Sequence, residues 1–207
     1  LLSLYFDIEL PLARVLFNME KIGFFVSEST LHSIGAELSK KISELTKQIY
    51  FLSGKEFNIN SPKQLGEVLF EDLGLPAGKK TKTGYSTNAE ILEGLRDKHP
   101  IVDLVLQYRQ LSKLLSTYVD GLLKVVGEDG RIHSNFKQTE TRTGRISSTE
   151  PNMQNIPVRT ETGREMRKFF IAKEGYTLLD ADYSQIELRV VAAMCDDENM
   201  KNAFLSG

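Results

Sequence analysis

The segment TLLDADYSQIELRVVAAM, residues 177–194, changes from a strand pattern to a helix pattern within two residues. Residues 177–183 are typical of a short strand, and Ser184 through Met194 of a helix with Ser184 as its possible N-cap. Asp182 therefore stands where the strand ends and the helix begins. This junction decides the expected fold, because it requires a sheet within a chain whose other segments are mostly helical.

The position of Asp182 suits a metal ligand. Carboxylates at strand ends beside helix termini reach metals or phosphates without interrupting a sheet. Magnesium uses hard oxygen ligands and usually takes one or two carboxylates, with water and substrate phosphate in its other positions. The alternative is that Asp182 only caps a tight turn. Asp180 lies earlier, on the same face of the expected strand as Asp182. It is expected to be a solvent-facing or hydrogen-bonded acid without a role as a ligand.

The first 126 residues predict helices joined by short connections. Apolar side chains at three- and four-residue spacing indicate one helix from Leu4 to near Gly23, followed by a short strand, Phe24–Val26. A second helix, capped by Ser27 or Ser29, runs to Gly54. A short helix is expected next, with Ser61 as its cap and Pro62 at its first position. An exposed loop at 77–90 follows, and then a small helix capped by Thr87 or Asn88. A long helix is expected from Pro100 to about Val126.

The remaining chain contains less regular structure. Residues 131–136 alternate weakly, as a strand does, and polar residues without a clear pattern follow through about Arg159. We therefore predict an α+β fold: a mainly helical part whose long helices form an antiparallel projection, and a small antiparallel sheet in which the strand through Asp182 pairs with at least one other strand.

Composition limits the functional classes. The 207 residues carry a formal net charge of −2, so binding to nucleic acid would depend on local patches rather than overall attraction. One such patch is 131–170, which contains eight Lys and Arg residues and four Asp and Glu residues and so has a net charge of +4. No apolar run approaches a membrane span and no signal peptide is visible, so a cytoplasmic location is expected. The single cysteine, Cys195, lies in the apolar run VVAAMC and is expected to be buried.

Four segments resemble one family. DYSQIELR, residues 182–189, resembles the palm motif of the bacterial DNA polymerase I family (family A DNA polymerases), and TRTGRISSTEPNMQNIPVR, residues 141–159, resembles the stretch just upstream. FNINSPKQLGEVLF at 57–70 and YRQLSKLLSTYVDGLL at 108–123 are similar to the family's thumb. The resemblance implies a palm-associated helix and strand at 1–26, a thumb with a small helical tip at 27–130, and the N-terminal part of a palm at 131–207.

The resemblance also implies a reaction, transfer of a nucleotide from a dNTP to a primer 3′-hydroxyl with two Mg²⁺ ions. Asp182 and the carbonyl of Tyr183 would bind the metals. Glu187 would exclude the 2′-hydroxyl of a ribonucleotide, although it could also be an ordinary acid in the first turn of a helix. Arg145 would reach the minor-groove edge of the primer terminus. Arg189 is expected to be structural.

Other polar and basic residues are implied as DNA contacts, since their side chains suit phosphate groups and base edges. Asn152, Gln154 and Asn155 could instead satisfy the backbone of their own loop, and Lys79 and Lys80 could simply be solvated. The implied contacts are Asn58, Asn60, Ser61, Lys82, Thr83, Ser86, Thr87, Arg109, Lys113, Ser116, Thr117, Asn135, Gln138, Thr141, Arg142, Asn152, Gln154, Asn155 and Arg159.

The family's second metal-binding aspartate and its finger helix would lie beyond residue 207, and any exonuclease carboxylates before Leu1. We therefore expect a truncated piece that binds primer-template DNA, is inactive alone and acts as a monomer without a membrane. Three alternatives remain. A non-enzymatic DNA-binding module would not require Asp182 with Glu187, a single-subunit RNA polymerase is disfavoured by Glu187, and a helical scaffold accounts only for the first 126 residues.

Overall fold

The structure, a computed structural model, describes residues 1–77, 84–157 and 161–206, with only the backbone at 161 and 162. It divides into two units, Leu1–Ile171 and Ala172–Gly207, which are described separately. In chain order the elements of the first unit are the π-helical turn η1 (Leu4–Glu9), α1 (Leu10–Ile22), β1 (Phe24–Phe25), α2 (Glu28–Ser53), α3 (Pro62–Gly66), the π-helical turn η2 (Glu67–Asp72), α4 (Ala89–Glu93), α5 (Pro100–Leu114), the π-helical turn η3 (Leu115–Val119), α6 (Asp120–Leu123), β2 (Arg131–Ile132), β3 (Asn135–Lys137), β4 (Ser147–Thr149) and α7 (Glu161–Arg167).

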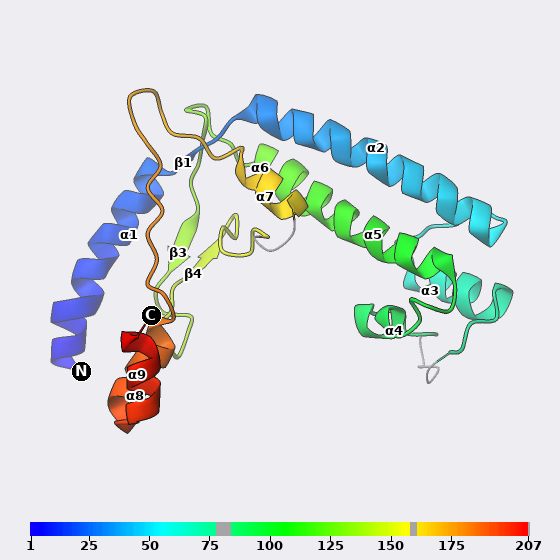
Figure 1. Cartoon of the computed structure of the whole chain (residues 1–207). Helices are drawn as coiled ribbons and strands as arrows, with labels where there is room; N and C mark the ends of the chain where they lie inside the picture. The colour runs from blue at the N-terminus through cyan, green and yellow to red at the C-terminus, as the bar shows by residue number, and fades with distance from the viewer. Residues whose placement is uncertain (78–83, 158–160, 207) are drawn as a thin grey trace. The chain divides into compact units, whose positions relative to one another are not determined.

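The long helices α2 and α5 pack side by side and run in opposite directions (Figure 1). Ser27 is the N-cap of α2, where its Oγ accepts from the Thr30 backbone N–H at 3.2 Å, and Pro100 begins α5. Gly35 lets α2 approach η3 closely, since a Cβ at this position would lie 3.0 Å from Cγ1 of Val119. The predicted antiparallel helix pair is confirmed, with Ser27 rather than Ser29 as the cap.

Two separate hydrophobic cores stabilise the first unit. One lies at the far end of the α2–α5 pair, where Ile49 and Ile101 pack with Leu65 and Leu69 of α3 and η2. The other lies near the strands and contains Leu31, Val119 and Ile132 together with Met166 and Phe169. Met166 lies in α7 and Phe169 follows it; the sequence did not predict α7, although it completes this core.

Two small antiparallel sheets replace the single expected strand at 131–136. β1 pairs with β2 with Phe24 opposite Ile132, and β3 pairs with β4 with Asn135 opposite Thr149. The prediction of one continuous strand was wrong because the chain changes partner at Ser134, whose Oγ donates to the carbonyls of Thr149 at 3.2 Å and Pro151 at 2.6 Å. β4 was also not expected, because Ser147–Thr149 carries no apolar alternation of its own. The α+β class is confirmed.

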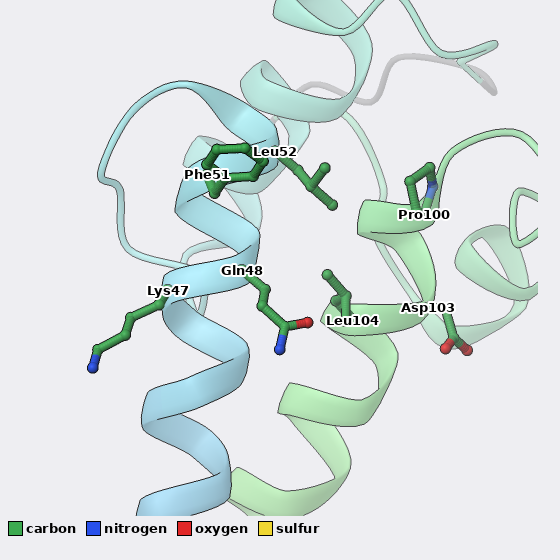
Figure 2. Close-up of a pocket in the computed structure, with 7 residues that line it drawn as sticks. All are labelled: Lys47, Gln48, Phe51, Leu52, Pro100, Asp103 and Leu104. Atoms are coloured by element: carbon green, nitrogen blue, oxygen red, sulfur yellow. The ribbon is translucent and has the colours of Figure 1, made fainter.

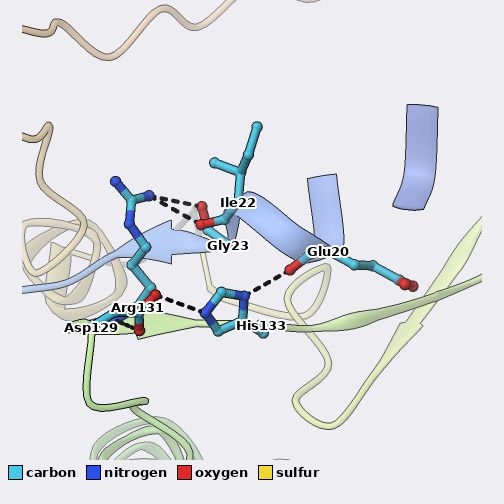
Figure 3. Close-up of polar contacts among 6 residues, drawn as sticks. All are labelled: Glu20, Ile22, Gly23, Asp129, Arg131 and His133. Carbon is cyan, nitrogen blue, oxygen red and sulfur yellow. Dashed lines mark hydrogen bonds and ion pairs between the residues drawn. The ribbon is translucent and has the colours of Figure 1, made fainter. Parts of the chain in front are cut away.

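Side chains from the β2 region bind the C-terminal end of α1 (Figure 3). Arg131 donates from one guanidinium nitrogen to the Ile22 carbonyl at 3.2 Å and to the Gly23 carbonyl at 3.3 Å. The His133 ring lies between the Glu20 carbonyl, 2.7 Å from Nδ1, and the Asp129 carboxylate, 3.1 Å from Nε2. Two basic residues thus bind carbonyls that the helix itself leaves without an N–H partner.

The second unit contains α8 (Ile186–Cys195) and α9 (Glu198–Leu205), which pack on each other, with the Arg189 guanidinium 4.8 Å from the centre of the Phe204 ring. The predicted strand at 177–183 was wrong. In the described part of the chain no segment pairs with it, and Leu179 is 91% exposed. A strand requires a neighbour to bond its backbone N–H and C=O groups, so alternation alone does not form one.

Two further expectations for the second unit were wrong. Gln185, at φ 52°, precedes α8 in place of Ser184, whose carbonyl instead accepts from Nε of Arg189 at 2.8 Å. Cys195 is exposed rather than buried, because α8 packs through a narrow face and Ala192 is its buried residue. Among the helices of the described residues, none combines the length and apolar character needed to cross a membrane.

Candidate nucleic-acid interface

A first cavity, with both polar and apolar lining, brings together predicted DNA-contact residues from two distant segments. Its volume is about 400 Å³, and its lining includes Lys113 and Thr117 from the α5–η3 helix and Asn152 and Asn155 from the loop after β4. Lys113 and Thr117 are exposed and lie one helical turn apart. The hydroxyl of the largely buried Tyr118 donates to the Asn155 carbonyl and so fixes this loop against η3.

The loop after β4 also uses its amide side chains internally. Oε1 of Gln154 accepts from the Ser148 N–H at 3.2 Å, and its Nε2 donates to the Ile146 carbonyl at 2.7 Å. Oδ1 of Asn152 accepts from the Gln154 N–H at 3.0 Å. For Gln154 the structure therefore favours the alternative that it satisfies its own loop, whereas Asn152 and Asn155 also line the cavity.

A second cavity of about 590 Å³, also with both polar and apolar lining, lies beside α5. Its lining includes four of the predicted contacts, Asn60, Ser86, Thr87 and Arg109. Nδ2 of Asn60 donates to the Tyr108 hydroxyl at 3.1 Å. Asn58 and Ser61 stabilise the turn before α3, because Oδ1 of Asn58 accepts from the Asn60 N–H at 3.0 Å and Oγ of Ser61 accepts from the Gln64 N–H at 3.4 Å.

The remaining predicted contacts of the first unit hold local structure or lie on exposed turns. Nδ2 of Asn135 donates to the Glu150 carboxylate at 3.2 Å, and Nε2 of Gln138 donates to the Glu9 carbonyl at 2.8 Å. The turn at 141–145 is closed by a bond from the Thr141 hydroxyl to the Arg145 carbonyl, and Gly144 has φ 77°. Arg142 and Arg145 are exposed, and Oγ of Ser116 donates to the Lys113 carbonyl at 3.4 Å. Lys82, Thr83 and Arg159, like Lys79 and Lys80, lie outside the described residues.

The predicted catalytic carboxylates lie in the second unit. Asp182 and Tyr183 are exposed in the segment before α8, and Glu187 is in the first turn of that helix. In the part of the chain that the structure describes, no three His, Cys, Asp or Glu side chains are grouped so that they could hold a metal ion. One carboxylate next to a main-chain carbonyl fits part of a magnesium site, since the ion keeps several positions for water and phosphate.

An apolar groove between the end of α2 and the start of α5 contains none of the predicted site residues (Figure 2). Its volume is about 560 Å³, and Phe51, 85% exposed, lies beside it with Leu52 and Leu104. Sequence reasoning did not identify it, because Phe51 falls outside the apolar period of its helix. Its lining is mostly apolar, although Lys47 is part of it, so the two cavities described above remain the candidate interface.

Comparison with known proteins decides the family, since residues 28–207 match the family model described as DNA polymerase family A. The chain belongs to DNA polymerase family A. It is 55% identical over 201 residues to DNA polymerase I of Lactococcus lactis subsp. cremoris (strain MG1363), and 53% identical over 205 residues to DNA polymerase I of Bacillus subtilis (strain 168). These matches cover 97% and 98% of this chain but 23% of each relative, so the chain spans about a quarter of their length.

A solved structure of the family has the same fold over the whole chain. The POL domain of Pol1 from M. smegmatis, in complex with DNA primer-template and dNTP, matches with a TM-score of 0.89 and 46% identity. The match covers 100% of this family A chain and 37% of that chain. The family predicted from the sequence is therefore confirmed.

Proposed function

We propose that this chain serves template-directed DNA synthesis, as part of a DNA-directed DNA polymerase that transfers nucleotides from dNTPs to a primer 3′-hydroxyl. Membership of family A and the likeness to a POL domain in complex with primer-template and dNTP support this proposal. Residues 27–130 would form the thumb, residues 131–207 the first part of the palm, and residues 1–26 the connection to it.

The observation that carries the proposal is the first cavity, where polar side chains from two segments meet. Lys113 offers a cation and Thr117 a hydroxyl on one side, while Asn152 and Asn155 offer uncharged amides on the other. Cations and hydroxyls bind DNA phosphates, and amides suit base edges and sugars. Minor-groove acceptors are present in every correct base pair, so such a site would recognise duplex geometry without sequence preference.

The chemical step would depend on Asp182 and the carbonyl of Tyr183 as ligands of Mg²⁺. When bound, the metal would lower the pKa of the primer hydroxyl and stabilise charge on the departing pyrophosphate. Glu187 would crowd a ribonucleotide's 2′-hydroxyl, and Arg145 would contact the primer terminus. Because Asp182 is the one carboxylate that we assign to the metal site, we propose that the chain alone binds DNA without extending a primer.

Fluorescence anisotropy with a labelled primer-template duplex tests the DNA-binding part. We expect the affinity to fall by orders of magnitude between about 50 and 200 mM salt, as several phosphate contacts require. Lys113→Gln should reduce the slope of log affinity against log salt by about 0.9, the value for one phosphate contact. Lys47→Gln, on an exposed face of α2 beside the apolar groove, is the matched control and should leave the slope unchanged. Salt-independent binding would refute the proposal.

A further inference from the structure

Arg109 does not point freely toward solvent, although the sequence pattern groups it with Lys113 as a phosphate contact. Its guanidinium donates from one nitrogen to the Thr87 carbonyl and from another to the Thr87 hydroxyl, the latter at 3.0 Å. Burial lowers the pKa of Arg109 below its usual value, but the group stays charged. Lys113, one turn further along the same helix, is exposed. The two cations thus have different surroundings.

Thr87 is itself held on both sides. It is 4% exposed, and its methyl carbon lies 3.8 Å from where a Cβ on Gly66 would be. A Cβ there would lie 3.1 Å from Cβ of Tyr85, and the Tyr85 ring packs at 5.0 Å from the ring of Phe70. Segment 85–87 therefore lies against α3 and η2 through apolar contacts, while the hydroxyl of Thr87 faces α5.

Adjacent residues of α5 hold the two sides of the second cavity. Tyr108 accepts a hydrogen bond from Asn60, which precedes α3, and Arg109 donates two to Thr87, which precedes α4. Asn88, next to Thr87, caps α4 by accepting from the Ile91 N–H at 2.9 Å. One turn of α5 therefore sets the spacing between Asn60 and Ser86, which line the cavity from opposite segments.

We propose that Arg109 is a positioning residue, which fastens segment 85–88 to α5 and so holds Ser86 in place for DNA opposite Asn60; this rests on the proposed function. The planar fork of arginine suits the task, because it donates to the carbonyl and the hydroxyl of one residue at the same time. Lysine would keep the charge but not the fork. The salt-dependent phosphate contact on this face of the helix belongs to Lys113.

Arg109→Lys separates the two roles in the full 207-residue chain. A phosphate contact survives this change, since lysine also binds phosphate as a point charge. Loss of the fork should instead weaken primer-template binding about fivefold with the salt slope unchanged. Thr87→Val keeps the shape of the side chain but removes the hydroxyl, and should weaken binding about twofold to threefold. In the Arg109→Lys background it should weaken binding little further, because both substitutions remove the same contact. Thr87→Ser keeps the hydroxyl and should weaken binding less than Thr87→Val does.

Amide hydrogen exchange gives a readout that does not need DNA. Arg109→Lys and Thr87→Val should speed exchange at Ser86–Ile91, while Lys113→Gln should not. A parental chain that fails to bind DNA would refute the proposed function, and the exchange data would still decide whether the Arg109 contact holds the segment. Parental affinity in Arg109→Lys, strictly additive effects of the two substitutions, or unchanged exchange would overturn the inference.

Discussion

At the scale of single residues, the same segment of sequence contains groups with different proposed roles. Asp182 and Glu187 are five positions apart, and both are acidic, but one lies before α8 and the other in its first turn. A metal ligand must be exposed to substrate phosphate, whereas a residue that excludes a hydroxyl acts through its bulk. Substitution by alanine should therefore have different consequences at the two positions.

The prediction concerns a chimera that joins this chain to the remaining polymerase sequence of the B. subtilis relative. Asp182→Ala should lower nucleotide incorporation roughly a thousandfold or more, while DNA affinity stays within about twofold, because a metal ligand and not a phosphate contact is lost. Glu187→Ala should retain dNTP incorporation and raise the ratio of kcat/KM for ribonucleotides over deoxynucleotides on the order of tenfold.

Steady-state incorporation with both sugars, under one set of conditions, measures these effects. Glu174→Ala, at an exposed acid of the same unit, is the control and should match the parent chimera. An Asp182→Ala chimera with parental turnover, or a Glu187→Ala chimera with parental sugar preference, would show that the corresponding assignment is wrong.

At the scale of elements, the end of α1 is contacted by a histidine, His133. Both nitrogens of His133 face acceptors, the Glu20 carbonyl and the Asp129 carboxylate, so the doubly protonated ring satisfies both (Figure 3). The hydrogen bond to the Glu20 carbonyl is the largest cause of a raised pKa of His133, and the Asp129 carboxylate raises the pKa further. Partial burial and the positive charge of Arg131 lower the pKa but do not cancel this rise. The Glu20 carboxylate is engaged separately, because it accepts from the Phe136 N–H at 2.6 Å.

We predict that this contact makes stability depend on pH. Because the folded pKa is raised, the contribution is fully present below the unfolded value of about 6.5 and is lost as pH rises through the folded pKa. The loss should be no more than about 1 kcal/mol, since the imidazole is 38% exposed and solvent screens the charge. Urea unfolding from about pH 5.5 to 8.5 measures it, over the range in which histidine changes charge.

His133→Gln should remove this pH dependence and leave α1 less protected from amide exchange at low pH. His32→Gln, on an exposed position of α2, is the matched control and should behave as the parent does. If the parent and His133→Gln showed the same pH profile, the ring would not be the responsible group.

At the scale of the whole molecule, the two units bury very different amounts of apolar surface. Residues 1–171 contain both hydrophobic cores, whereas Ala192 is the buried hydrophobic residue among the described residues of the second unit. Leu179, Tyr183 and Met194 are each at least 80% exposed. Since apolar burial provides most of the free energy of folding, the stability of the chain should depend on its first unit.

A chain ending at Ile171 should therefore unfold in urea with a free energy within about 1 kcal/mol of the parent, because few buried contacts are lost. A chain ending at Gly163 is the matched comparison. It loses Met166 and Phe169, both 0% exposed, and should be destabilised by about 5 kcal/mol or more. Equal stability of the two shortened chains would contradict this assignment of the core.

The sequence by itself determined the family, the helices of the first 126 residues and the short strand that begins at Phe24, because these patterns depend on nearby residues. It left two candidates for each of two helix caps, and the structure selects Ser27 and Asn88. The tertiary structure alone decided how the strands pair, the existence of β4 and the use of the polar residues. Ser147–Thr149 became a strand because β3 pairs with it, and residues 177–183 did not, because no described segment does. Arg109 and Lys113 look alike in sequence, but only the packing of Thr87 against α3 places a hydrogen-bond acceptor beside Arg109. Pairing and partner choice depend on distant residues, which local patterns do not encode.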